Sequence, residues 1–170
     1  MLLWNIYLLM NNQKTITIIG AGLMVKPMVD YFIQKKAYRI NLLDRFVDKA
    51  VRIKGNRPEC TAIEWLNNDT ELLDSVIMNT DIVISMVPKP VHIIIARSCL
   101  KYKKNMVTAS YEVPALMDLK AEVEDQGILI LSELGEVPGV DHFGTQMLLE
   151  QIKNENGKIL SINSYGSGIP

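Results

Sequence analysis

The stretch Thr15-Ile-Thr-Ile-Ile-Gly20-Ala-Gly22-Leu-Met-Val25-Lys-Pro27 decides the fold of this 170-residue chain. Its β-branched residues are typical of a buried parallel strand, and the two glycines predict a tight turn into a helix that begins near Leu23. The first N–H groups of such a helix have no partner within it and lie at its positive end. A pyrophosphate can bind there, because glycine has no Cβ to block its approach.

A second apolar run, Tyr38–Leu43, ends in Asp44, which lies 24 positions after Gly20. A carboxylate at this point can accept hydrogen bonds from the ribose diol of an adenosine. Strand, glycine turn, helix and acid together predict a dinucleotide-binding domain. Val25 stands where the motif has its third glycine, which packs the helix against the strand, so an apolar residue is tolerable. The expected phosphate-binding residues are Gly20, Gly22, Leu23, Met24 and Val25.

The residues at the end of the second expected strand are compatible with either NAD or NADP as the cofactor. Asp44 would repel the 2′-phosphate of NADP and therefore favours NAD. Arg45 can pair with that phosphate, which favours NADP, or stack on the adenine. These two residues do not decide between the dinucleotides. We expect NADP because of Arg45 and of the family resemblance described below, and NAD is the alternative.

Apolar runs alternate with helical patterns along most of the chain. Regular alternation of this kind implies right-handed crossovers, and so an α/β fold with a Rossmann-like, doubly wound parallel sheet. Strands are expected at Thr15–Ile19, Tyr38–Leu43, Thr61–Trp65, Ile82–Val87, Asn105–Thr108 and Ile128–Leu131. Helices are expected near Met24–Gln34, Val47–Ile53, Glu71–Met78, Val91–Tyr102 and Pro114–Asp125.

The pattern changes after residue 132, where glycines and a proline crowd the segment up to His142. A helix from Asp141 to about Asn154 is expected next, with Asp141 able to cap it, and then a strand at Lys158–Tyr165. We therefore expect three parts: an N-terminal extension at 1–13, a dinucleotide-binding domain at 14–132, and the truncated beginning of a second, α+β domain at 133–170.

Composition excludes several classes of protein. A net charge of −1 gives no reason to expect nucleic acid or an anionic membrane as a partner. The apolar start, Met1–Met10, is shorter than the ~20 residues that span a bilayer, and it lacks the basic segment and cleavage site of a signal peptide. Cys60 and Cys99 are far apart in sequence and are expected to be apolar fillers, with no metal, in a cytoplasmic protein.

Several segments together resemble the saccharopine dehydrogenase (L-glutamate-forming) family. The similarity runs from about Lys14 to the end of the sequence. It implies a nicotinamide-nucleotide domain followed by a catalytic and dimerisation domain, a homodimer when full length, and NADP as cofactor. It also implies reduction of an imine formed from an aminoadipate semialdehyde and glutamate, or the reverse oxidation. The segments are 18–22 with Pro27, 81–88, 107–111 with 114–116, 133–135 with 138–142, and 164–170.

The resemblance also suggests which residues act on the substrate. Tyr111 matches the family's active-site tyrosine, which can donate a proton to the imine nitrogen. The alternative is that Tyr111 only packs its ring under a loop. Val137 stands where the family has an aspartate and Gly166 where it has a cysteine, so a substrate other than saccharopine stays open. Asp141 and His142 are further candidates at the expected domain junction, Asp141 either as a proton carrier or as a helix cap.

Ser85, Val87 and Pro88 end the fourth strand, where they are expected to cover the nicotinamide ribose or simply to stop the strand. His92 is expected to be a partly buried structural residue near the face that binds the cofactor. Glu133 is a candidate cleft residue and Glu136 a solvated one.

Cations that would hold an acidic substrate are scarce after Arg97, where the chain has lysines but no arginine. Bidentate clamps for a polycarboxylate would therefore come from outside this segment, or the substrate is less acidic. Two other functions stay open. A non-catalytic nucleotide-binding module is compatible with Val137 and Gly166. An S-adenosylmethionine methyltransferase shares the glycine turn and the acid, although six parallel strands argue against it.

Overall fold

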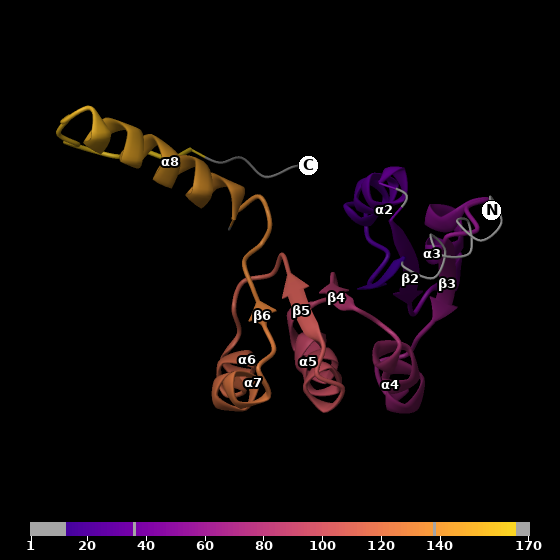
Figure 1. Ribbon diagram of the computed structural model, residues 1–170. Helices are drawn as coiled ribbons and strands as arrows, with labels where there is room; N and C mark the ends of the chain where they lie inside the picture. Colours follow the sequence, from indigo (N-terminus) through magenta and orange to yellow (C-terminus); the bar gives the residue numbers. More distant parts are fainter. Residues whose placement is uncertain (1–12, 36, 138, 166–170) are drawn as a thin grey trace, which may run out of the picture.

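The computed structural model describes residues 13–35, 37–137 and 139–165. Its centre is a six-stranded sheet in which every neighbouring pair of strands is parallel (Figure 1). The order along the sheet is β3-β2-β1-β4-β5-β6, so the direction of winding reverses between β1 and β4. The strands are β1 (Lys14–Ile19), β2 (Tyr38–Asp44), β3 (Cys60–Glu64), β4 (Ile82–Ser85), β5 (Asn105–Thr108) and β6 (Ile130–Leu131).

Helices cover both faces of the sheet, as expected for a doubly wound fold. Figure 1 shows α2 and α3 on one side and α4, α5, α6 and α7 on the other. A short 3-10 turn, η1 (Lys89–Val91), precedes α5. The helices are α2 (Val25–Gln34), α3 (Val47–Lys54), α4 (Thr70–Met78), α5 (His92–Lys101), α6 (Pro114–Met117), α7 (Lys120–Gln126) and α8 (Val140–Asn154).

Two apolar clusters form the core, one on each face of the sheet. Successive side chains of a strand point to opposite faces, so β1 contributes to both clusters. Ile16 and Ile18 pack with Val25 and Val29 of α2, whereas Ile19 packs in the other cluster with residues of α4 and α5. Burial on both faces explains why the strand is an almost continuous apolar run.

Some expected boundaries were wrong. The expected strand Ile82–Val87 ends at Ser85, and Ile128–Leu131 shortens to the two residues of β6. The expected helix Pro114–Asp125 is two helices, because the chain turns at Asp118 and Leu119; this turn lets both Leu116 and Leu119 reach the core.

The segment after residue 132 departs most from expectation. Helix α8 begins at Val140, not at Asp141, and none of its residues is buried. Figure 1 shows it projecting away from the sheet. No strand forms at Lys158–Tyr165, which is largely exposed, since no strand of the described chain lies beside it to pair with its backbone. A second domain beginning at 133 stays a prediction, and residues 1–12 and 166–170, Gly166 among them, lie outside the described residues.

Candidate functional site

The glycine turn between β1 and α2 is shaped by contact with the end of β4. Gly20 has φ +104°, a backbone conformation that L side chains rarely adopt, and a Cβ built on it would lie 2.4 Å from the carbonyl oxygen of Met86. Gly22 differs, because no atom lies within 4 Å of the place where its Cβ would be. The fold itself therefore requires glycine at 20, whereas at 22 glycine leaves open space in front of the turn.

The N-terminus of α2 is open. Val25 begins the helix, one residue after the expected Met24, and its N–H donates to the carbonyl oxygen of Gly22. Within the described chain, the N–H groups of Gly22, Leu23 and Met24 have no hydrogen-bond acceptor, and the N-cap makes no side-chain bond. Leu23 is 96% exposed. Unpaired N–H groups at a helix N-terminus are suited to an anion.

Asp44 ties the end of β2 to this turn. One carboxylate oxygen accepts the N–H of Ala21 at 2.7 Å, and the other accepts the N–H of Phe46 at 2.8 Å. The residue expected to bind a ribose therefore also braces the glycine turn. Each carboxylate oxygen has a second lone pair, so a ribose hydroxyl can still donate to Asp44.

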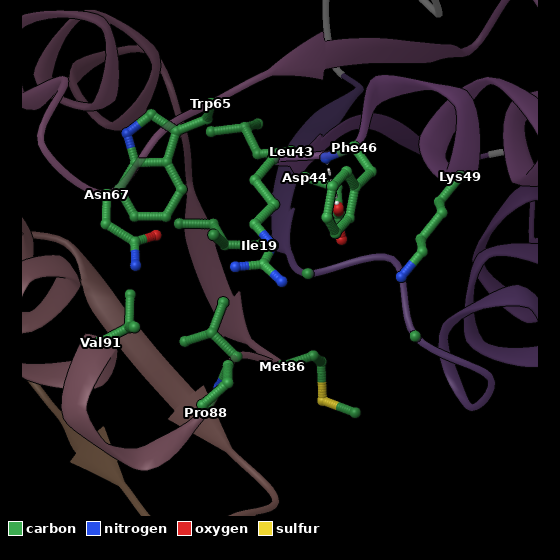
Figure 2. Close-up of a pocket in the computed structure, with 14 residues that line it drawn as sticks. Ile19, Leu43, Asp44, Phe46, Lys49, Trp65, Asn67, Met86, Pro88 and Val91 are labelled. Atoms are coloured by element: carbon green, nitrogen blue, oxygen red, sulfur yellow. Dashed lines mark hydrogen bonds between the residues drawn. The ribbon is translucent and has the colours of Figure 1, made fainter.

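A pocket of about 280 Å³ opens at the reversal of strand order, between the carboxyl ends of β1 and β4. Ligands of open parallel sheets bind at this point of the fold. Figure 2 shows Trp65 and Asn67 at one side, Lys49 at another, and Val91, Pro88 and Met86 along a third. The lining residues are Ile19, Gly20, Gly22, Leu43, Asp44, Arg45, Phe46, Lys49, Trp65, Asn67, Met86, Val87, Pro88 and Val91.

The pocket brings together most of the cofactor residues expected from the sequence. Gly20, Gly22, Asp44 and Arg45 line it, as do Val87 and Pro88. The other four lie around it in different ways. Leu23 and Met24 present their backbone at the helix start; Val25 is 1% exposed and packs in the core, and Ser85 is buried behind the lining.

Two cations surround the aromatic ring of Phe46. The Arg45 guanidinium lies 4.5 Å from the ring centroid and the Lys49 ammonium 4.9 Å from it. Lys49 lines both the pocket and an adjoining hollow of about 390 Å³, which Arg52 also lines. The side of the pocket next to Asp44 is therefore positively charged.

Sequence reasoning missed the wall opposite these cations. Trp65 follows β3 directly and is 2% exposed, and its indole N–H donates to the carbonyl oxygen of Asp69 at 2.9 Å. Asn67 lies two residues further along. A usable signal was present, since Trp65 is the last residue of the expected strand Thr61–Trp65 and Asn67 follows that strand closely. Lys49 was harder to predict, because it lies on the first turn of α3 and reaches the pocket from there.

The residues suggested for chemistry do not form one cluster. Tyr111 follows β5, is 49% exposed, and carries the Lys89 ammonium 5.0 Å from its ring centroid. Asp141 and His142 lie on α8 and hydrogen-bond each other at 2.8 Å, and within the described chain neither is bonded to Tyr111. Glu133 lies nearer Tyr111, since its carboxylate accepts the N–H of Glu112 at 3.4 Å.

Asp141 is not the helix cap that the sequence suggested. Gly139 occupies the N-cap position, and Asp141 is the second helical residue, with a carboxylate that accepts the Gly139 N–H at 3.0 Å. Desolvation raises the pKa of Asp141, but the hydrogen bonds from the N–H groups of His142 and Gly139 outweigh it, so the pKa lies below its ordinary value. Glu136 and Val137 are exposed.

None of the described helices is long and apolar enough to cross a membrane. Cys60 and Cys99 are both buried and unpaired, and burial raises the pKa of the Cys99 thiol to about 12. A thiol that stays protonated is a poor nucleophile and a poor metal ligand. The cysteines therefore belong to the core and not to the site.

Known proteins resemble this chain in sequence and in fold. Saccharopine dehydrogenase (NADP+, L-glutamate-forming) of Pyricularia oryzae is 30% identical over 92% of the chain, which matches 35% of that protein. Mitochondrial alpha-aminoadipic semialdehyde synthase of rat is 30% identical over 96% of the chain and 18% of its own length. Apo saccharopine dehydrogenase (L-Glu forming) of Saccharomyces cerevisiae superposes with a TM-score of 0.77 at 27% identity, covering 84% of this chain and 32% of that one.

The chain thus spans about a third of the fungal relatives and less than a fifth of the rat protein. A family defined as the saccharopine dehydrogenase NADP binding domain matches residues 16–131, from β1 to the end of β6. The matched range contains the glycine turn, Asp44 and the whole pocket. With more than half of its residues matched, the chain belongs to the saccharopine dehydrogenase NADP-binding domain family.

Proposed function

We propose that the chain provides the nucleotide-binding part of an NAD(P)-dependent oxidoreductase that acts on the C–N bond of an amino or imino acid, saccharopine or a related compound. The pocket at the strand reversal carries this proposal. Open N–H groups stand at one end of it, and a braced carboxylate with two cations stands beside them. The names of the fungal and rat relatives support the substrate class.

The surroundings of Asp44 favour NADP over NAD. Both oxygens of its carboxylate already accept backbone N–H groups, so part of its charge is engaged before any ligand binds. Arg45 and Lys49 place two positive charges on the same side of the pocket. A 2′-phosphate carries close to two negative charges, and paired cations in a partly enclosed site stabilise it more than a ribose hydroxyl.

The chain's own residues would orient the dinucleotide and handle a proton. A bound nicotinamide supplies the hydride, which is chemistry of the cofactor. Tyr111 lies beyond the carboxyl end of β5, on the ligand-binding edge of the sheet, where its phenol O–H can serve as a proton donor to an imine nitrogen. Asp141 and His142 are a second candidate pair, to be tested separately from Tyr111.

Titration of the chain with NADPH and NADH, followed by the nicotinamide fluorescence, tests the proposal. NADPH should bind with the lower dissociation constant. Arg45→Ala should reduce this preference, whereas Arg97→Ala, an exposed arginine on α5 that lies outside the pocket, should not. Absence of saturable binding of both dinucleotides would contradict the assignment. Binding without saccharopine oxidation, by a protein that also contains the remaining length of the relatives, would favour the non-catalytic module instead.

A further inference from the structure

The loop between β4 and α5 forms one side of the pocket. A single hydrogen bond joins the residue before this loop to the residue after it. Met86, Val87, Pro88 and Val91 of this loop line the pocket. Ser85 immediately precedes the lining and His92 immediately follows it. The Ser85 hydroxyl and Nδ1 of His92 are 2.7 Å apart, and both residues are fully buried.

The other nitrogen of the same imidazole reaches the neighbouring strand. Nε2 of His92 lies 2.9 Å from the hydroxyl of Ser110, which comes just after β5 and directly before Tyr111. Ser110 is itself held by its backbone: its N–H donates to the Thr108 hydroxyl at 3.2 Å, and its carbonyl oxygen accepts the N–H of Glu133 at 2.9 Å. One side chain therefore connects the pocket loop to the segment that carries Tyr111.

The imidazole of His92 is neutral, so its two nitrogens play different roles in these bonds. Burial lowers the pKa of His92, so the ring is uncharged at neutral pH. A neutral imidazole has one donor nitrogen and one acceptor nitrogen, so one serine hydroxyl must donate to it and the other must accept. The two hydroxyls are thereby fixed in complementary orientations, and the two loop segments are held at a set separation.

We propose that His92 is a positioning residue: through Ser85 and Ser110 it sets the Met86–Val91 side of the pocket against Tyr111, and so orders the nicotinamide half of the dinucleotide site. The inference rests on the proposed function, since it concerns the same pocket. It goes beyond a structural role in the core, because the imidazole connects two segments of the ligand-binding edge and not two helices behind it.

The adenosine half of the site is built from different residues. Asp44, Arg45 and Lys49 come from β2, the turn after it and α3, and none of them is hydrogen-bonded to His92 or its serines. Loss of the His92 bonds should therefore leave binding of 2′,5′-ADP unchanged while weakening binding of NADPH. A residue that merely stabilised the fold would affect both ligands alike.

The test compares dissociation constants of NADPH and 2′,5′-ADP for the full chain and for Ser110→Ala, His92→Gln and His92→Phe. Glutamine keeps an amide near the position of Nε2 and can still reach Ser110, whereas phenylalanine loses both bonds. Ser98→Ala is the matched control, because Ser98 is a buried serine on the same helix that bonds to Asp74, away from the pocket.

We expect Ser110→Ala to weaken NADPH binding about tenfold, the value of one buried hydrogen bond, and His92→Phe, which loses both bonds, to weaken it by more than that, with 2′,5′-ADP within about twofold of the unmodified chain in each case. His92→Gln should lie between the unmodified chain and His92→Phe, and Ser98→Ala should change neither ligand. Equal weakening of both ligands, or no change in either, would overturn the inference. Ser110 is only partly buried, so Ser110→Ala should still fold. This variant therefore tests the inference even if the His92 variants do not fold. An unmodified chain that binds neither ligand would instead overturn the proposed function, and this inference with it.

Discussion

Two alanine substitutions only two residues apart should have different effects, and together they test how the glycine turn works. Gly20→Ala should lower the free energy of unfolding, whereas Gly22→Ala should leave the fold intact and weaken dinucleotide binding. The reason lies in their surroundings. A Cβ at 20 meets the Met86 carbonyl at 2.4 Å, and a Cβ at 22 meets nothing within 4 Å.

The magnitudes follow from those contacts. At Gly20, φ +104° costs an L residue on the order of 1–3 kcal/mol, and overpacking against the backbone of Met86, just after β4, adds on the order of 1–3 kcal/mol. For a chain of this size the sum lowers the melting temperature by roughly 5–25 °C. At Gly22, where φ is not in the left-handed region, alanine stabilises the fold by about 0.4–1 kcal/mol through the unfolded state.

Binding should respond in the reverse order. A methyl group at 22 enters the open space beside the turn, which the proposed phosphates would occupy, and so keeps them away from the N–H groups of Leu23 and Met24. Each charge-assisted hydrogen bond contributes about 1.5–3 kcal/mol, so the dissociation constant for NADPH should rise about 10- to 100-fold. Thermal unfolding and fluorescence titration measure the two effects separately. Full NADPH affinity in Gly22→Ala would refute the placement of the phosphates at this turn.

Three further substitutions and conditions give defined outcomes. Lys49→Ala should weaken NADPH about tenfold more than NADH in a titration of both, by loss of a cation near the 2′-phosphate; equal losses would place Lys49 elsewhere. Asp44→Ala should destabilise the fold by about 2 kcal/mol in urea, because the N–H groups of Ala21 and Phe46 lose their acceptor; an unchanged urea midpoint would show that the brace contributes nothing. Because burial lowers the pKa of His92, the unfolded chain binds more protons below pH ~6.5, so unfolding free energy should fall by up to about 1.4 kcal/mol per pH unit from there down. His92→Phe should remove that slope, and a slope kept in the variant would exclude His92 as its source.

The sheet could be predicted from sequence because its strands are defined by local patterns. Each of the first five expected strands overlaps an observed one, and β1 and β2 pair in register from Lys14 with Tyr38 to Ile19 with Leu43. Strand ends were less predictable. Val87 and Pro88 continue the apolar pattern of β4, but the backbone leaves the sheet at Met86 to form the pocket loop.

The structure after residue 132 could not be predicted, because it depends on contacts with distant residues, which the local sequence pattern does not reveal. Apolar residues recur along α8 with helical spacing, and Val140, Phe143 and Met147 are each more than 60% exposed. The pattern correctly indicates a helix, but it does not say what covers the apolar face. For Lys158–Tyr165 the pattern indicates a strand, yet a strand forms only where a partner is present for its backbone groups.

Site residues could be predicted where the backbone geometry requires one residue type. They could not be predicted where side chains from distant segments of the sequence come into contact. Gly20 and Asp44 are separated by one helix and one strand, a spacing common to dinucleotide folds, so the sequence shows them together. Trp65 and Lys49 reach the same pocket from β3 and α3, and only the packing of those elements against β2 brings them there. The hydrogen bonds of His92 likewise join three segments that no motif connects.

The three positions of the glycine motif have three different physical causes, and only one concerns a ligand. Gly20 is required by a positive φ and by the Met86 carbonyl, so its absence would damage the fold with or without a dinucleotide. Val25 is 1% exposed between α2 and β1, where a larger apolar side chain fills the interface that glycine would leave thin. Gly22 alone faces open space. The departure at the third position therefore affects packing, which is why the motif can lose its last glycine and keep the open turn at which we propose that the phosphates bind.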